Sequence, residues 1–252
     1  MSTRDTPWPA GTPCWVDYSA PDLEAAKAFY ADLLGWTYSG GDPEYGGYLT
    51  CELNGRAAAG MAPQMDPSSA GWTTYFAVAD AAATAARIDA AGGTVVVPPM
   101  QVGPMGTMAI AMDPQANVFG LWQAGLNTGV QISGEPGALV WNEASVDDVT
   151  TAQTFYSHVF GFHFDEVEGA GGYSTFGLDE RPLGGLGGPT EGAPRGWSTC
   201  FAVASADDTV TAVTAAGGTV TMPAMTTPWG RFAVLDDPWG QSFEVMEELE
   251  EG

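Results

Sequence analysis

Hydrophobic and polar positions alternate along the chain in patterns that predict a fixed order of elements. A short β-type run, PCWVDYS, precedes residues 22–34, whose apolar positions recur at helical spacing until Gly35. The next stretch, YLTCELNGRAAAGM, predicts a hairpin around the two-residue turn Asn54-Gly55. A strand (GWTTYFAVA), an Ala-rich helix and further strands around an Asp-Pro turn complete the series. The pattern therefore predicts βαβββ-type order with a second helix.

The same series occurs twice, because five groups of residues return in the same order. Each group reappears 124 to 126 residues later, a spacing too constant for chance. We interpret the chain as a tandem duplication. The matching groups are Phe29-Tyr30 with Phe155-Tyr156, Gly46-Gly47-Tyr48 with Gly171-Gly172-Tyr173, GWTTYFAVA with GWSTCFAVA, AAGGTV with AAGGTV, and Asp113-Pro114 with Asp237-Pro238.

This duplication predicts two modules of similar size. We expect a first module over residues 1–123 and a second over residues 138–252, which ends in an acidic tail. The intervening residues 124–137 are rich in Gly and polar side chains and lack apolar periodicity, so they are expected to form a linker.

Composition and charge narrow the possible partners. The 31 acidic and 7 basic side chains give a formal net charge of −24, which argues against binding to nucleic acids or anionic membranes and tolerates a cationic small molecule. An apolar signal core and a run of membrane-spanning length are both absent from the sequence. The three cysteines are far apart and odd in number, which is typical of a reducing compartment. We expect a cytoplasmic protein.

Four segments in this order resemble the vicinal oxygen chelate superfamily of glyoxalases, bleomycin-resistance proteins and extradiol dioxygenases, and in particular its two-module actinobacterial members. The resemblance covers nearly the whole chain in both repeats and implies an α+β fold. In that fold βαβββ modules pair so that curved sheets enclose a cup, with helices outside. The matching segments are the strand, Pro-Asp and FYADLLGW of residues 15–36, AAAGMAP (57–63), YFAVAD (75–80) and GRFAVLDDPWGQSFEV (230–245).

The resemblance also implies positions for a divalent metal ion, which enzymes of the superfamily hold on His, Gln or Glu. These positions fall on Trp15, Thr73 and Gly120 in the first half, and on Trp141, Ser198 and Glu244 in the second. An indole has no lone pair to donate and a single hydroxyl is a poor ligand. Glu244 alone among them could coordinate an ion, so we expect no metal and no cofactor.

Alternation within the strands assigns side chains to the cup. Isolated acids there are candidates for general acid or base work, and aromatic and sulfur-containing side chains are candidates for stacking on a flat ring system. Trp72 and Trp197, which recur at a strand start, add to this aromatic supply or belong to the core. The candidate catalytic residues are Asp17, Glu143 and Glu244, and the candidate ligand-binding residues are Trp15, Thr73, Tyr75, Trp122, Trp141, His163, Ser198, Cys200 and Met246.

Two of these assignments have a plain structural alternative. His163 either lines the mouth of the cup or is an ordinary strand residue near its rim. Glu244 either acts in catalysis or pairs with Arg231 on the adjoining strand.

The sequence leaves two classes of function open. The first is a metal-free binding protein that sequesters or carries an aromatic, antibiotic-like small molecule in a Trp-lined cup. The second is a metal-independent tailoring enzyme, of isomerase, lyase or hydroxylase type, that uses a cup carboxylate. A metal-dependent glyoxalase or dioxygenase is a distant third. A monomer and a homodimer are both compatible with the sequence.

Overall fold

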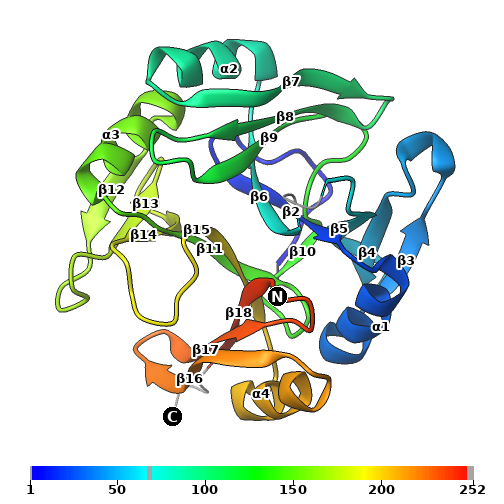
Figure 1. The fold of residues 1–252 in the computed structure, drawn as a ribbon. Coiled ribbons are helices and arrows are strands. Elements are labelled where there is room, and N and C mark those ends of the chain that lie inside the picture. The colour runs from blue at the N-terminus through cyan, green and yellow to red at the C-terminus, as the bar shows by residue number, and fades with distance from the viewer. Residues whose placement is uncertain (1, 67–69, 249–252) are drawn as a thin grey trace.

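The computed structural model describes residues 2–66 and 70–248. It contains two curved β-sheets flanked by helices (Figure 1). The expected α+β fold of tandem βαβββ modules is confirmed. Within the described residues the α-helices are α1 (Leu23–Leu34), α2 (Ala81–Ala90), α3 (Val149–Phe160) and α4 (Ala206–Ala215), and a 3₁₀ turn spans Pro43–Tyr45.

The first sheet takes all eight of its strands from the first half of the chain. Their order is β3-β4-β5-β2-β6-β9-β8-β7, so β2 and β6 lie at the centre. Because β2 pairs in parallel with β5, and β6 in parallel with β9, the sheet consists of two βαβββ units. The strands are β2 (Pro13–Ala20), β3 (Thr37–Gly40), β4 (Leu49–Leu53), β5 (Arg56–Pro63), β6 (Gly71–Ala77), β7 (Thr94–Val102), β8 (Gly106–Met112) and β9 (Val118–Ala124).

The second sheet repeats this order with the second half of the chain, as β12-β13-β14-β11-β15-β18-β17-β16. It also includes β1 (Ser2–Thr3) and β10 (Ile132–Ser133), so the segment between the halves carries a short strand and a buried Ile132. The other strands are β11 (Leu139–Ser145), β12 (His163–Glu166), β13 (Ser174–Gly177), β14 (Pro182–Gly187), β15 (Gly196–Ala202), β16 (Thr219–Thr227), β17 (Gly230–Asp236) and β18 (Ser242–Glu247).

The first helix of each half is bounded by matching residues. The side chain of Asp22 caps α1 by accepting from the backbone N–H of Ala25, and Asp148 caps α3 in the same way. Both helices end at a glycine in the left-handed conformation, Gly35 and Gly161, which lacks the Cβ that would strain this backbone. These local signals explain why the two halves begin alike.

The halves pack through the convex faces of their sheets. Thr74 on β6 donates to the Asn142 side chain at 3.0 Å and lies 3.5 Å from Thr199, its own counterpart in the repeat. Each helical tyrosine also crosses to the other half: Tyr30 donates to Asp237 at 3.1 Å, and Tyr156 donates to Asp113 at 3.1 Å. Two of the duplicated sequence groups therefore form the junction between the modules.

Each sheet curves until its two arms approach one another on the concave side, which faces away from the helices. In Figure 1 the four βαβββ units surround the centre of the molecule, with the helices on the outside. We call the concave faces of the first and second sheets the first and second cup. Among the described residues, no helix is both long and apolar enough to cross a membrane.

Candidate functional site

The central strands place their alternate side chains as the sequence predicts. Tyr18 on β2 packs against Tyr30 of α1, with ring centroids 5.2 Å apart, so its neighbours in alternation face the cup. Trp15 and Asp17 therefore point into the first cup. By the same alternation, Trp141 and Glu143 point into the second cup.

A hydrogen-bonded relay organises the first cup. The indole of Trp15 donates to the Tyr48 hydroxyl at 2.8 Å, and that hydroxyl donates to Asp17 at 3.2 Å. Burial raises the pKa of Asp17 to about 6, opposed by hydrogen bonds from Tyr75 and Tyr48. Trp15 itself is 3% exposed, so little of its indole can reach a ligand.

The second cup contains the same relay with a longer acid. Trp141 donates to the Tyr173 hydroxyl at 3.0 Å, and Tyr173 donates to Glu143 at 2.7 Å. Trp141 and Glu143 are only partly buried. Burial raises the pKa of Glu143, while the bonds from Tyr173 and Trp141 oppose that rise.

Two glycines make room for these tyrosines. A Cβ atom on Gly60 would lie 1.8 Å from the Tyr48 hydroxyl oxygen, and one on Gly185 would lie 1.7 Å from that of Tyr173. Both glycines pair directly with the acid, Asp17 or Glu143, on the adjoining strand. The duplicated Gly-Gly-Tyr groups of the sequence thus supply a relay member that alternation within strands could not reveal.

The floors of the two cups differ. In the first cup the Tyr75 ring covers Gly120, where an added Cβ would meet the ring at 2.0 Å. In the second cup the corresponding residues are Cys200 and Glu244, which pair on β15 and β18. The smaller Cys200 leaves the space that the Glu244 side chain occupies.

Glu244 is a buried acid with an incomplete set of partners. It is 1% exposed and accepts a hydrogen bond from Ser198 at 2.5 Å through Oε1, whereas Oε2 is buried and has no partner within residues 2–66 and 70–248. Burial and the nearby charge of Glu143 raise the pKa of Glu244 well above its usual range, despite the Ser198 bond. An unpaired buried carboxylate costs stability, so its presence needs a reason.

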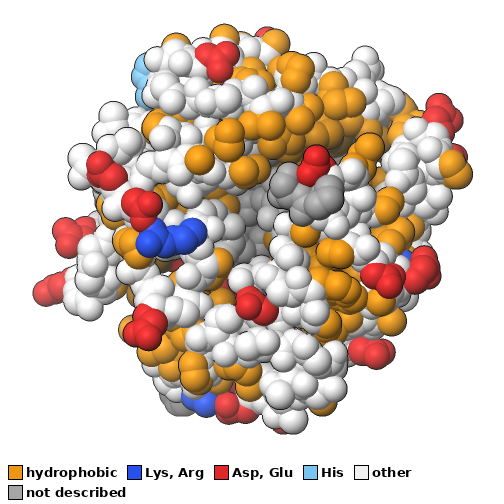
Figure 2. Space-filling model, viewed as in Figure 1, with side chains coloured by type: hydrophobic (Ala, Val, Ile, Leu, Met, Phe, Trp, Pro, Cys, Tyr) orange, Lys and Arg blue, Asp and Glu red, His pale blue; other side chains and the backbone are white. Residues whose placement is uncertain are grey.

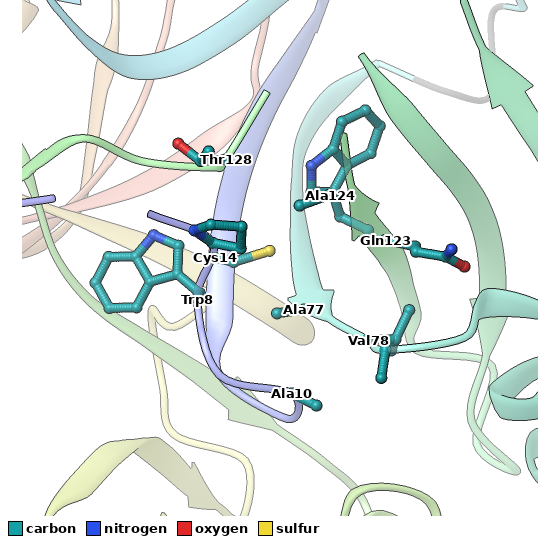
Figure 3. A pocket seen from close by; sticks show the side chains of 11 residues that line it. Trp8, Ala10, Cys14, Ala77, Val78, Gln123, Ala124 and Thr128 are labelled. Atoms are coloured by element: carbon teal, nitrogen blue, oxygen red, sulfur yellow. The ribbon is translucent and has the colours of Figure 1, made fainter. Parts of the chain in front are cut away.

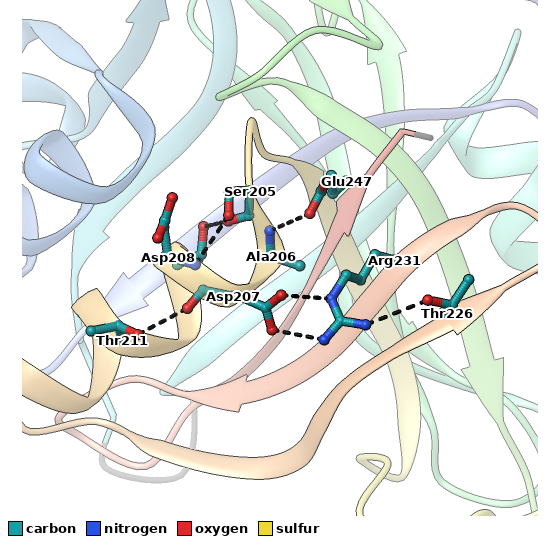
Figure 4. Close-up of polar contacts among 9 residues, drawn as sticks. Ser205, Ala206, Asp207, Asp208, Thr211, Thr226, Arg231 and Glu247 are labelled. Carbon is teal, nitrogen blue, oxygen red and sulfur yellow. Dashed lines mark hydrogen bonds and ion pairs between the residues drawn. The ribbon is translucent and has the colours of Figure 1, made fainter. Parts of the chain in front are cut away.

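Arg231 does not supply the missing partner. Its guanidinium forms two 2.8 Å hydrogen bonds with Asp207 at the start of α4 and a weaker one with Thr226 (Figure 4). The alternative in which Glu244 pairs with Arg231 is therefore wrong.

An exposed aromatic side chain stands over the second cup. Trp229, in the turn between β16 and β17, is 56% exposed, and its ring centroid lies 6.4 Å from that of Tyr173. This contact joins the two arms of the sheet. The counterpart of Trp229 in the first half is Met105, where Tyr45 instead approaches Gly103. Alternation could not identify Trp229, because it lies in a turn.

Several predicted ligand-binding residues lie beside these clusters. Thr73 and Ser198 pair directly with Asp17 and Glu143, and Met246 follows Glu244 on the same face of β18. Trp122 donates to the Asn127 carbonyl at 2.9 Å and lines a separate cavity of about 280 Å³ with Trp8 and Cys14 (Figure 3).

Three other aromatic or basic residues lie elsewhere. His163 is exposed on edge strand β12 and pairs with Asp165 at 3.4 Å, three strands from β11 in the sheet order. Trp72 and Trp197 donate to Tyr30 and Tyr156 on the convex faces and line a cavity of about 650 Å³ between the modules. We therefore exclude both tryptophans from the cups.

The metal of the related enzymes does not match this donor set. The second cup offers two carboxylates and two hydroxyls, and the first offers one carboxylate and two phenols, with no imidazole in either cluster. Over residues 2–66 and 70–248, no group of three His, Cys, Asp or Glu side chains could hold an ion. Imidazole and several carboxylates are what such sites require.

Acidic side chains outnumber basic ones on the face shown in Figure 2, although white and orange atoms cover most of it, and the centre of that face is hollowed. This agrees with the net charge of −24.

Relatives of known sequence span almost the full chain. The putative glyoxylase CFP32 of Mycobacterium tuberculosis is 39% identical over 246 residues, covering 94% of each chain. The anthracycline biosynthesis proteins DauV of Streptomyces sp. strain C5 and DnrV of Streptomyces peucetius are 36% and 35% identical. DauV is matched over 94% of this chain and 93% of its own, and DnrV over 96% and 94%.

Solved structures show the same fold at low identity. A Mn(II)-bound glyoxalase from Novosphingobium aromaticivorans superposes with a TM-score of 0.67 at 18% identity, covering 96% of this chain and 83% of its own. A family model matches residues 14–121 and again residues 138–245. The chain therefore belongs to the glyoxalase/bleomycin resistance protein/dioxygenase superfamily, represented by two tandem modules.

Proposed function

We propose that the protein binds a planar aromatic small molecule in its second cup. The observation that carries this proposal is the position of Trp229, which exposes more than half of its surface beside Tyr173. An exposed indole held beside a second aromatic ring offers a flat face on which a planar ligand can stack. Tyr173 connects this indole to Trp141 and Glu143 on β11.

The first cup is less suited to a ligand. Its Trp15 is almost fully buried, and the Tyr75 ring fills the space above Gly120. The acid there has phenol donors from two tyrosines. We therefore assign the ligand to the second cup and a structural role to the first.

The polar groups of the second cup suit a ligand that donates hydrogen bonds. Glu143 is partly accessible and can accept from a phenol or an ammonium group. The strongly negative protein favours a neutral or cationic ligand over an anionic one. The similarity to DauV and DnrV supports an anthracycline or another fused-ring aromatic compound as the ligand class.

A fluorescence titration tests the proposal. Daunorubicin, a planar anthracycline, is added to the protein and its own fluorescence is followed as it stacks. Trp229→Ala should weaken binding at least tenfold, a typical loss for an aromatic anchor of about 1.4 kcal/mol. Met105→Ala, the matched change in the first cup, should leave the affinity unchanged.

The titration separates the two cups clearly. Equal loss from Trp229→Ala and Met105→Ala would remove the assignment to the second cup. An absence of binding across daunorubicin and a panel of uncharged anthraquinones would contradict the proposed ligand class.

A further inference from the structure

The second cup contains two carboxyl groups where the first has one. Glu143 and Glu244 lie on the same face, on strands separated only by β15. Within the described part of the chain, neither carboxylate forms an ion pair with Lys, Arg or His. The first cup has one acid, Asp17, because Gly120 occupies the position that corresponds to Glu244.

Ser198 lies on the strand between the two acids, and its hydroxyl bonds with only one of them. It pairs directly with Glu143 across β11 and β15, while its hydroxyl donates to Glu244 at 2.5 Å. The single proton of the Ser198 hydroxyl is used in the bond with Glu244 Oε1, and Oε2 has no hydrogen-bond partner among the described residues. Burial without a second donor favours the protonated, uncharged form of this carboxyl, because an ionised carboxylate loses more solvation.

The surroundings give the two acids different properties. Glu244 is fully enclosed between Cys200 on β15 and Val234 on β17. Glu143 is partly accessible, faces Gly185 on β14 and accepts from Tyr173. The titratable groups that face the pair are Tyr173 and Cys200, which are both neutral because burial and the carboxylate charges raise the pKa of each. Two acids in unequal environments are a common source of a base beside an acid.

We propose that Glu143 is the general base of a metal-independent proton transfer on the ligand bound in the second cup, and that Glu244 is a positioning residue that remains protonated behind it. This proposal rests on the proposed binding site. The substrate class is a ketone fused to an aromatic ring, because the ring would stack on the indole of Trp229 and a CH₂ group next to a carbonyl is a carbon acid on which a carboxylate base can act.

The step is a tautomerisation that needs no co-reactant. Glu143 takes a proton from the CH₂ carbon, the C–H electron pair becomes the C=C bond of an enolate, and the carbonyl oxygen takes the negative charge. The Glu143 carboxylic acid then returns the proton to that oxygen, which gives the enol. Protonated Glu244 adds no second negative charge next to the enolate.

Hydrogen–deuterium exchange of 1-tetralone in D₂O tests this step. The protein, treated with a chelator, is mixed with saturating ketone, and loss of the CH₂ signal is followed by NMR. Glu143→Gln should slow exchange about a hundredfold or more, the usual contribution of a general base. Glu166→Gln, the same change at an exposed acid on β12 of the second sheet, should exchange at the wild-type rate.

The pH profile tests the separate role of Glu244. In the wild type, exchange should fall at low pH, where Glu143 is protonated, and again at high pH, where an ionised Glu244 repels the enolate. Glu244→Gln imitates the protonated acid, so it should keep the fall at low pH and lose the fall at high pH. A residue with a merely structural role would leave the shape of the profile unchanged.

The other possible results of the exchange experiment contradict either the proton transfer, the binding site or the absence of a metal. If 1-tetralone quenches the cup tryptophans but the wild type exchanges no faster than Glu143→Gln, the proton transfer is wrong and the binding site stands. If it neither binds nor exchanges, both proposals fail for this class of ketone. If exchange disappears with the chelator and returns with Mn²⁺, the step depends on a metal and the inference is overturned.

Discussion

The two cups share a frame and differ at their floors. Both contain a Trp–Tyr–carboxylate relay, and in both a glycine makes room for the tyrosine hydroxyl. The floor of the first cup is a phenol ring over Gly120, whereas the floor of the second is a buried acid beside Cys200. The two copies therefore share the Trp–Tyr–carboxylate relay and differ in the residues at the floor of the cup.

The two cups also differ in how well their buried polar groups and aromatic side chains are satisfied by contacts within the protein. The first cup satisfies its acid with phenols and shields its indole. The second cup leaves one oxygen of Glu244 without a partner among the described residues, and it exposes the indole of Trp229. Features that cost stability in one copy and are absent from the other are the basis on which we place the proposed ligand and proton transfer in the second cup.

Giving the first cup the floor residues of the second should have the largest effect on the free energy of unfolding. Gly120→Glu alone places a side chain against the Tyr75 ring and buries an acid, so we expect the free energy of unfolding to fall by more than about 3 kcal/mol. Adding Tyr75→Cys should restore more than about 1 kcal/mol, because it recreates the space found beside Cys200. Urea unfolding of the two single variants and the double variant measures this coupling.

Simple additivity of Gly120→Glu and Tyr75→Cys would contradict the exchange of space between these residues. Tyr75→Phe is the control, since it keeps the ring over Gly120 and removes only the hydroxyl that bonds with Asp17.

The framework could be predicted from the sequence because it depends on local patterns. Alternation placed Trp15, Asp17, Trp141 and Glu143 on the concave faces, and the repeated groups identified the modules. The role of Tyr48 could not be predicted, because it depends on its approach to Gly60 across the sheet. A pattern within one strand contains no information about such a contact.

Contacts between residues far apart in the chain could not be predicted from the sequence either. Trp229 lies in a turn, and only the curvature of the sheet brings it to Tyr173. Trp72 and Trp197 were grouped with the cup aromatics by recurrence, although they pack at the junction of the modules. Recurrence could not distinguish core from site, because the duplication copied both.

The pH dependence of stability should distinguish the acids of the two cups. The pKa of Asp17 is about 6 in the folded protein and lies near 3.8 when the chain is unfolded. The folded state therefore holds this proton to higher pH, so stability is lost as the pH rises from about 4 to about 6. We expect Asp17→Asn to remove about 3 kcal/mol of this loss, as measured by urea unfolding at a series of pH values.

Glu244→Gln sharpens this comparison. Burial and the Glu143 charge raise the pKa of Glu244 well above its usual range, so the stability that its proton supplies should be lost as the pH rises above that range, and Glu244→Gln should remove this loss. An unchanged pH dependence of the free energy of unfolding in Glu244→Gln would contradict the raised pKa.

The junction of the modules should show the smallest effects and no difference between the halves. Asp113 accepts from the Asn117 amide as well as from Tyr156, and Asp237 accepts from the Tyr18 hydroxyl as well as from Tyr30. Tyr30→Phe and Tyr156→Phe each remove one bond to a carboxylate and one acceptor of an indole N–H, so each should lower the free energy of unfolding by about 2 kcal/mol. Denaturant unfolding should give equal losses that add in the double variant, because the two contacts share no partner. Unequal losses would show that divergence extends from the cups into the junction.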